Sequence, residues 1–291
     1  MAQRPPLLRR MAAALPGLAL LLLFPAWPGN GAPSCGVKTP CRIASGEYRI
    51  RVPEEWNGRT PLGAIVFLHG WRGSARAELR NPAWVQLANQ LNVAVVLPEG
   101  KDGTWSYPGA PDALRDDFAF FEDLVSDLAR RFPIRRDRLM AAGFSIGGSM
   151  VWNLACYRGE LFSGYAPVAG AFWEPVPESC PSPVPDLYHV HGTEDRTVPL
   201  LGRPIGERWH QSTVADSLAV WQRKAGLAVI FPKTAPAEGL GCQRQETGEA
   251  VLEVCLHAGG HSLRAAWIAR AWRALAHDLQ QDRQQGAQDT P

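Results

Sequence analysis

The sequence predicts an α/β protein with one mostly parallel central sheet and helices on both faces of that sheet. Short continuous apolar runs, such as 64–68 and 93–97, are typical of strands that are covered by helices on both sides. Helix-compatible segments alternate with these runs, which indicates βαβ units. At 291 residues, 46% of them apolar, the chain is long enough for one large domain with a complete core.

Patterns of apolar, polar and charged residues predict the elements in chain order. Residues 47–52 alternate between apolar and polar side chains, as expected for a strand with one exposed face, whereas the later strand candidates are continuous apolar runs. Segment 116–132 begins with acidic residues and ends with Arg130 and Arg131, which complements a helix dipole. The expected strands are 47–52, 64–68, 93–97, 139–142, 165–169, 187–191 and 251–257, and the expected helices are 82–91, 116–132, 146–157, 213–225 and 264–279.

Residues 1–32 have the pattern of a secretory signal peptide. Arg4, Arg9 and Arg10 precede the apolar run 11–24, and a Pro- and Gly-containing stretch follows it. The apolar run is too short to span a bilayer comfortably, although a retained anchor is the alternative. We therefore expect a signal peptide at 1–32, one globular domain at 33–280, a polar C-terminal tail at 281–291, and no stable membrane insertion after cleavage.

The net charge of the chain limits its possible binding partners, and its cysteines indicate the cellular compartment. Residues 1–32 contain three arginines and no acidic residue, so the mature chain is nearly neutral, which gives no signal for binding nucleic acid or anionic membranes. All six cysteines follow the signal, as suits disulfides in a secreted or periplasmic protein. Their order and spacing favour three pairs among the connectivities that six cysteines allow: Cys35 with Cys41, Cys156 with Cys180, and Cys242 with Cys255.

Ser145 is the candidate nucleophile. It is the serine of a G-x-S-x-G pattern, Gly143 to Gly147, between an apolar strand and a helix. A nucleophile on so tight a turn takes a strained backbone conformation, and glycines two residues away let neighbouring backbone approach. The alternative is an ordinary strand-to-helix turn with a serine N-cap. The flanking strand 139–142 and helix 146–157 favour the nucleophile.

A serine hydroxyl needs a base to take its proton and an acid to orient that base. Asp195 and His261 each follow a predicted strand, in the chain order serine, acid, histidine. Glu194 is the alternative acid, and the Val-Pro turn after Asp195 favours Asp195. His257 is the alternative base, but it lies within an apolar strand, where a buried structural histidine is more common.

The oxyanion of an acyl-transfer reaction needs hydrogen-bond donors. The backbone N–H groups of Ile146 and Trp71 are the expected donors, and His69 is expected to brace the loop that carries Trp71. His189 and His191 share one face of a strand, but two histidines without a third ligand are weak evidence for a metal site. We expect no metal and no organic cofactor.

These motifs, together with Leu68-His69-Gly70 and Leu154-Ala155-Cys156, resemble the polyhydroxybutyrate depolymerase / feruloyl esterase (LpqC-like) group of α/β-hydrolases. The resemblance covers roughly residues 35 to 275. It implies the α/β-hydrolase fold and a secreted carboxylic-ester hydrolase that acts through a Ser-His-Asp triad and an acyl-enzyme. It also supports the pairing of Cys156 with Cys180.

The chain departs from that group at two positions. Leu263-Arg264 follows the candidate base where the group usually has a Trp, and Trp71 stands where a Cys often follows the His-Gly pair. Both departures concern the pocket rather than the triad. They leave the chemistry unchanged and the substrate open.

The segment between the strands at 165–169 and 187–191 is too short for a large cap domain, so an open site is expected. Trp71, Trp105, Tyr107 and Trp173, with Phe172, belong to loops at strand ends and could form aromatic walls, or they could be anchors packed on the core. Such walls suit short hydroxyalkanoate oligomers or feruloyl- or acetyl-type esters, and the sequence gives no signal for an oligomeric state. The alternative functions are a serine peptidase on the same fold and a non-catalytic polymer-binding envelope protein.

Overall fold

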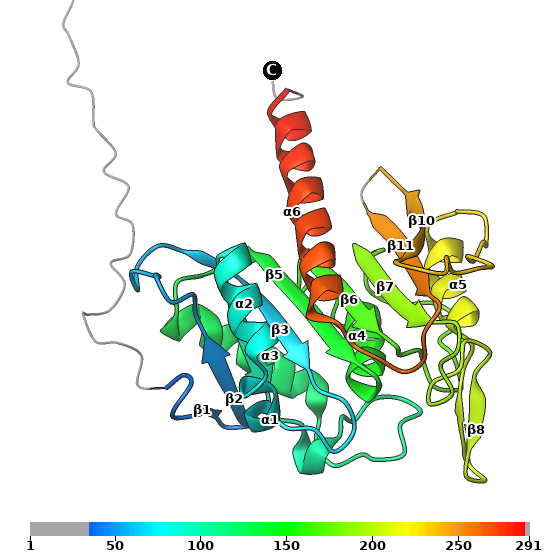
Figure 1. Cartoon of the computed structure of the whole chain (residues 1–291), viewed down its shortest axis with the longest axis horizontal. Helices are drawn as coiled ribbons and strands as arrows, with labels where there is room; N and C mark the ends of the chain where they lie inside the picture. The colour runs from blue at the N-terminus through cyan, green and yellow to red at the C-terminus, as the bar shows by residue number, and fades with distance from the viewer. Residues whose placement is uncertain (1–34, 249, 289–291) are drawn as a thin grey trace, which may run out of the picture. The chain divides into compact units, whose positions relative to one another are not determined.

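The computed structural model describes residues 35–248 and 250–288, and a nine-stranded sheet runs through the described part (Figure 1). The strand order is β1-β2-β4-β3-β5-β6-β7-β11-β10. The strands are β1 (Cys41–Ile43), β2 (Gly46–Arg51), β3 (Leu62–Leu68), β4 (Val93–Pro98), β5 (Ile134–Phe144), β6 (Gly164–Val168), β7 (Leu187–Gly192), β10 (Gly241–Glu246) and β11 (Val251–His257). Neighbouring strands from β4 to β11 in this order pair in parallel, whereas β1 and β2 at one end of the sheet and β10 at the other join it by antiparallel pairing. The predicted mostly parallel sheet is confirmed.

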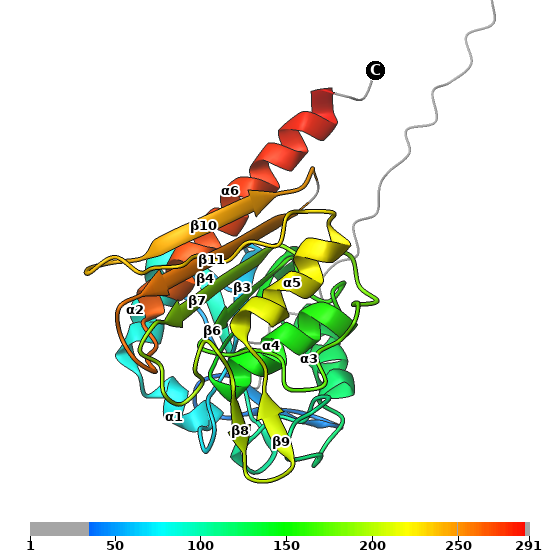
Figure 2. The same ribbon diagram turned by 90° about the vertical axis from the view of Figure 1, so that its right-hand side faces the viewer.

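Helices cover both faces of the sheet, as predicted (Figures 1 and 2). One layer contains α1 (Ala75–Leu79), α2 (Pro82–Leu91) and α6 (Ala265–Gln288), and the other contains α3 (Asp117–Arg131), α4 (Ile146–Tyr157) and α5 (Val214–Lys224). Trp84 of α2 and Trp272 of α6 share one buried cluster, whereas Phe121 of α3 and Trp221 of α5 belong to the second. The sheet therefore has a core on each side, which explains its continuous apolar strands.

Local sequence signals set the ends of these helices. The side chain of Asp116 accepts a hydrogen bond from the N–H of Ala119 at the start of α3, and Arg130 and Arg131 lie in its last turn. Asn81 caps α2 in the same way through Ala83, and Asn92 ends that helix in the left-handed conformation. Strand β4 follows at once, and all of its residues are buried.

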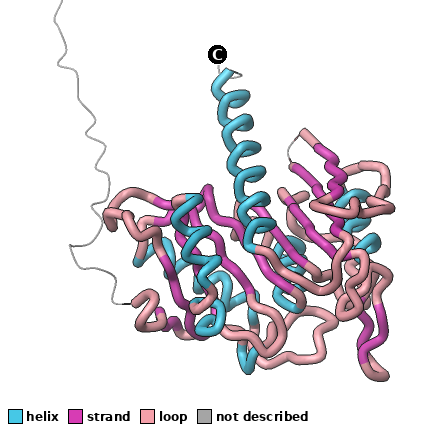
Figure 3. Tube along the Cα trace, viewed as in Figure 1, coloured by secondary structure: helices cyan, strands magenta, loops and turns pink. Residues whose placement is uncertain are grey.

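Figure 3 shows the observed helices, strands and loops. Several of the observed elements extend beyond the predicted ones. Strand β5 begins at Ile134, before the predicted start at residue 139. The prediction missed its first half because that half is rich in charged residues and shows no apolar run. Helix α6 continues to Gln288 through residues that we expected to be a polar tail, since this stretch has helix-compatible glutamines and no proline. Strands β1 and β10, helix α1, the 3-10 turn η1 (Lys101–Gly103) and a two-stranded sheet of β8 (Arg203–Ile205) and β9 (Trp209–Gln211) were not predicted.

The carboxyl ends of the parallel strands carry the loops that matter for function. The described segment 169–186, between β6 and β7, is a loop and provides no helical cap, as predicted. The hairpin β8–β9 lies instead between β7 and α5, and an isolated bridge joins Gln211 to Trp173. The predicted signal peptide at 1–32 falls outside the described residues. In the part of the chain that the structure describes, no helix is both long and apolar enough to cross a membrane.

Candidate active site

Ser145 occupies a strained turn between β5 and α4. Its backbone has φ 58° and ψ −123°, a conformation unusual for a residue with a side chain. Its N–H donates to the carbonyl oxygen of Val168 on β6, at 2.9 Å. The hydroxyl makes no capping hydrogen bond to the helix, so this serine does not serve as an ordinary N-cap. Backbone strain of this kind is concentrated at functional sites.

The glycines of the pattern are needed for packing. A Cβ on Gly147 would lie 2.6 Å from the carbonyl oxygen of His69 and would overlap that of Leu68. A Cβ on Gly143 would lie 2.6 Å from the carbonyl carbon of Gly147. These distances are far shorter than real Cβ contacts. The absence of a side chain at Gly147 therefore lets the turn pack against the end of β3, and its absence at Gly143 lets β5 approach the start of α4.

The loop after β3 passes directly beside Ser145. A Cβ placed on Gly70 would lie 3.5 Å from the Cβ of Ser145. His69 holds this loop: its Nδ1–H donates to the Gly70 carbonyl at 2.8 Å, and its Nε2 accepts the N–H of Gly100 at 3.0 Å. Burial lowers the pKa of His69, outweighing the opposite effect of the Gly70 hydrogen bond, so this histidine is a neutral brace.

Asp195 lies in the turn after β7 with both carboxylate oxygens engaged. Its Oδ1 accepts the N–H groups of Thr197 and Val198, each at 2.8 Å, and its Oδ2 lies 2.7 Å from Nδ1 of His261. Burial alone would raise the pKa of Asp195, but the hydrogen bonds from His261 and Val198 outweigh burial and lower it. The carboxylate is therefore charged and fixed in orientation.

His261 follows β11 and reaches back to the nucleophile turn. Its ring centroid lies 4.6 Å from that of Phe144, the residue before Ser145. The alternative base, His257, is used elsewhere: its Nδ1 accepts the N–H of Gly259 at 3.0 Å, and its ring packs on Trp267 at 4.6 Å. The structure thus brings together the ends of β5, β7 and β11, and it pairs His261 with Asp195.

Glu194, the alternative acid, is exposed to solvent, whereas the neighbouring Asp195 is 5% exposed. The backbone of Glu194 contributes to the site in another way, because its N–H donates to the carbonyl of Gly259 at 3.1 Å. This bond ties the acid turn to the loop of His261. The geometry therefore favours Asp195 as the partner of the histidine.

Two buried histidines, His189 and His191, support the acid turn from behind, a role that we did not predict from the sequence. Nε2 of His191 lies 2.7 Å from the carbonyl oxygen of Val198 and 3.6 Å from Oδ2 of Asp195. Because a carbonyl can only accept, this nitrogen carries the proton. Nδ1 of His191 then accepts from Nε2–H of His189 at 3.0 Å. Burial lowers the pKa of His191 to about 4, so the pair is neutral near pH 7. Their facing nitrogens are therefore joined by a hydrogen bond.

The candidate substrate-binding aromatics separate into two kinds. Trp71 is 61% exposed on the loop beside Ser145. Trp105 is fully buried, and its Nε1–H donates to the carbonyl of His69 at 2.9 Å, so its prediction as an aromatic wall is corrected to a loop anchor. Tyr107 and Trp173 are each 7% exposed and pack edge to face at 6.5 Å, and Phe172 is buried. Of these five aromatic residues, Trp71 alone offers a large open surface.

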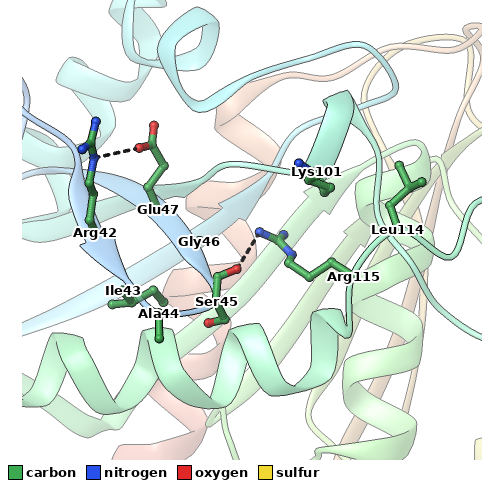
Figure 4. Close-up of a pocket in the computed structure, with 9 residues that line it drawn as sticks. All are labelled: Arg42, Ile43, Ala44, Ser45, Gly46, Glu47, Lys101, Leu114 and Arg115. Carbon is green, nitrogen blue, oxygen red and sulfur yellow. Dashed lines mark hydrogen bonds and ion pairs between the residues drawn. The ribbon is translucent and has the colours of Figure 1, made fainter.

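A separate cavity of about 440 Å³ lies at the β1–β2 hairpin (Figure 4). It contains no residue of the nucleophile, acid or histidine segments. Nε of Arg42 lies 3.5 Å from Oε2 of Glu47, and Nη2 of Arg115 lies 2.5 Å from Oδ1 of Asp117. Two of the arginines that line the cavity are therefore already paired with carboxylates. Its lining residues are Arg42, Ile43, Ala44, Ser45, Gly46, Glu47, Lys101, Leu114 and Arg115. This cavity does not belong to the candidate active site.

The six cysteines form three disulfides in the arrangement that their spacing favoured. Cys156 with Cys180 ties the helix that follows Ser145 to the loop between β6 and β7, and Cys242 with Cys255 joins paired residues of β10 and β11. The remaining bridge joins Cys35 with Cys41. Glu253 lies near Cys242 and Cys255, but their sulfurs are bonded to each other and offer no thiolate to a metal.

No family model matches the chain. In sequence it is similar to NocK, a protein named as an esterase from Nocardia uniformis, with 29% identity over 226 residues that cover 69% of this chain and 65% of that protein. The chain thus spans just under two thirds of that relative. It is also similar to feruloyl esterase C of Emericella nidulans, with 26% identity over 203 residues that cover 66% and 72%. Acetyl xylan esterase from Aspergillus awamori has a similar structure, with TM-score 0.57, 12% identity, and coverage of 80% of this chain and 98% of that one.

Proposed function

We infer that this chain, which has the α/β-hydrolase fold and resembles the feruloyl esterase group in sequence, is a serine carboxylic-ester hydrolase. The observation that carries the proposal is the pairing of His261 with Asp195 at 2.7 Å, beside the strained turn of Ser145. A fold alone does not define a function, but this arrangement of nucleophile, base and acid is suited to acyl transfer.

In the proposed reaction, Ser145 Oγ attacks the ester carbonyl while His261 takes the serine proton. Asp195 keeps the proton of the neutral imidazole on Nδ1, because its Oδ2 accepts from that nitrogen. Nε2 of His261 is then free to act as the base, and Asp195 stabilises the imidazolium that forms. His261 next protonates the leaving alcohol, and water releases the acyl group by the same steps in reverse.

We assign the oxyanion hole to the backbone N–H groups of Ile146 and Trp71. Ile146 is the first residue of α4, so its N–H has no partner within the helix. Trp71 follows Gly70, which lies against Ser145. Loss of one such donor typically costs about 3–4 kcal/mol of transition-state stabilisation.

The proposed substrates are short hydroxyalkanoate oligomers or feruloyl- or acetyl-type esters, bound at an open site. The printed name of the Emericella relative supports the feruloyl type. The open loop between β6 and β7 and the exposed Trp71 support a substrate that enters from solvent without a cap. We further propose that the protein works outside the cytoplasm, which its three disulfides support.

A substrate panel tests the proposal with purified protein that starts near residue 33. The panel holds p-nitrophenyl acetate and butyrate, methyl ferulate, 3-hydroxybutyrate oligomers and a peptide amide, each assayed with wild type and Ser145→Ala. We expect turnover of at least one ester, abolished in the variant. Turnover of the peptide amide alone would point to a peptidase, and binding without turnover would point to a non-catalytic protein.

A further inference from the structure

The loop beside Ser145 contains a tight turn with an unusual residue at its tip. The N–H of Gly73 donates to the carbonyl of Gly70 at 2.9 Å, which places Trp71 and Arg72 at the two central positions of a β-turn. Arg72 has φ 60°, in the left-handed region. Glycine or asparagine is favoured at such a position, and a residue with a long side chain is disfavoured. An outlier next to a reactive serine suggests a function for that side chain.

Arg72 is held from two sides. Its N–H donates to the carbonyl of Gly103 at 2.8 Å, and a Cβ on Gly103 would lie only 3.0 Å from the Cα of Arg72. Its guanidinium carbon lies 4.1 Å from the centroid of the Trp71 ring, and Trp71 is itself 61% exposed. The planar cation thus rests on an exposed aromatic surface and has less freedom than an ordinary surface arginine.

The charged side chain of Arg72 is exposed on this loop. Among the side chains of residues 35–248 and 250–279, no carboxylate pairs with Arg72, and its own side chain makes no hydrogen bond to these residues. Arg115 and Arg270, by contrast, are paired with Asp117 and Glu253. Stacking on an indole uses a face of the guanidinium and leaves its N–H groups at the edge free, and this edge matches the two oxygens of a carboxylate.

We propose that Arg72 binds a carboxylate of the substrate, so that the preferred esters carry a negative charge on their acyl or alcohol part. The inference rests on the proposed esterase function, because it places this group near the carbonyl that Ser145 attacks. Arg72 is two residues from Gly70, which lies against Ser145, so it belongs to the same loop that borders the proposed nucleophile. Among the candidate substrates above, the hydroxyalkanoate oligomers end in such a carboxylate, whereas simple acetyl and feruloyl esters do not.

Two matched pairs of substrates test this specificity and distinguish the position of the charge. The 3-hydroxybutyrate dimer and its methyl ester differ in a carboxylate on the alcohol part. Mono-p-nitrophenyl adipate and p-nitrophenyl hexanoate differ in a carboxylate on the acyl part. The value of kcat/KM is measured for each at low salt, since surface electrostatics are screened at high ionic strength. The proteins are wild type, Arg72→Gln and the control Arg76→Gln, which alters another exposed arginine nearby on α1.

We expect wild type to prefer the charged member of at least one pair and Arg72→Gln to lower that preference about tenfold, with the neutral ester changed less than about twofold. Arg76→Gln should retain the wild-type preference. Arg72→Gly should also lose the preference for the charged substrate. Because glycine suits a left-handed turn, this variant shows whether the loss arises from the missing guanidinium or from a misfolded loop. The inference is overturned if neither pair shows a preference that depends on Arg72. In that case continued turnover of the neutral esters by wild type would leave the esterase proposal intact, whereas no turnover of any ester would end both.

Discussion

Replacing Asp195 by Asn alters the proposed triad in a way that the structure makes specific. Oδ1 of Asp195 accepts two backbone N–H groups, from Thr197 and Val198, at 2.8 Å each. The amide oxygen of Asn must take that place, because an NH₂ group cannot accept these bonds. The NH₂ group then faces Nδ1 of His261, 2.7 Å from the present Oδ2. His261 would have to accept there and carry its proton on Nε2, the nitrogen that should take the serine proton.

The expected loss is about 10⁴-fold in kcat, as seen when this tautomer is enforced in other Ser-His-Asp enzymes. At 1.36 kcal/mol per tenfold change, this loss corresponds to about 5.4 kcal/mol of transition-state stabilisation. The free energy of unfolding should change by less than about 2 kcal/mol, because Asn keeps both turn hydrogen bonds and the volume of the side chain.

The assay is steady-state hydrolysis of the best ester in the panel, with Ser145→Ala as background and urea unfolding as the stability measurement. Glu194→Gln is the matched control, because this neighbouring carboxylate is exposed and should be dispensable. Asp195→Asn with more than about a tenth of wild-type kcat would refute the reasoning. A comparable loss of kcat in the well-folded Glu194→Gln variant would mean that the assignment of the acid to Asp195 is wrong.

Two further predictions concern stability. Burial lowers the pKa of His191 to about 4 from the ordinary value of 6.5, so the unfolded chain binds more protons between these pH values. The free energy of unfolding should therefore fall as the pH drops from about 6.5 to about 4, by about 3 kcal/mol from this group. His191→Gln, which cannot titrate but can still donate to Val198, should flatten that slope in urea titrations, and an unchanged slope would argue against a neutral buried His191. Gly147→Ala would overlap the carbonyl of Leu68 and should lower stability by about 3 kcal/mol or more. The control Gly248→Ala has open space for its methyl group, so equal melting temperatures for the two variants would contradict the packing argument.

Much of the fold could be predicted because burial on two faces leaves a clear trace in sequence. Strands β3 and β4 appear as uninterrupted apolar runs, and the G-x-S-x-G pattern marks the turn into α4. The segments of Asp195 and His261 could be found because each follows a predicted strand. Their catalytic roles stay predictions, which the experiments above test.

Other features left no usable signal. An aromatic residue in a loop can face solvent or anchor the loop, and nothing in the sequence separated the exposed Trp71 from the buried Trp105. The three-residue strands β8 and β9 are too short to show a period. The spacing of His189 and His191 on one face of a strand, just before the acid, was a visible hint of their contact. It could be interpreted only once the turn of Val198 was seen to close over them.

The central claim is that Ser145 is the nucleophile, and covalent labelling tests it most directly. The purified protein is treated with diethyl p-nitrophenyl phosphate, which phosphorylates activated serines, and the site is located by peptide mass spectrometry. The account predicts one diethylphosphoryl group per chain, on Ser145, with release of p-nitrophenol and parallel loss of ester hydrolysis. An unmodified Ser145 in protein that still cleaves esters, or full activity after Ser145 is modified, would contradict it.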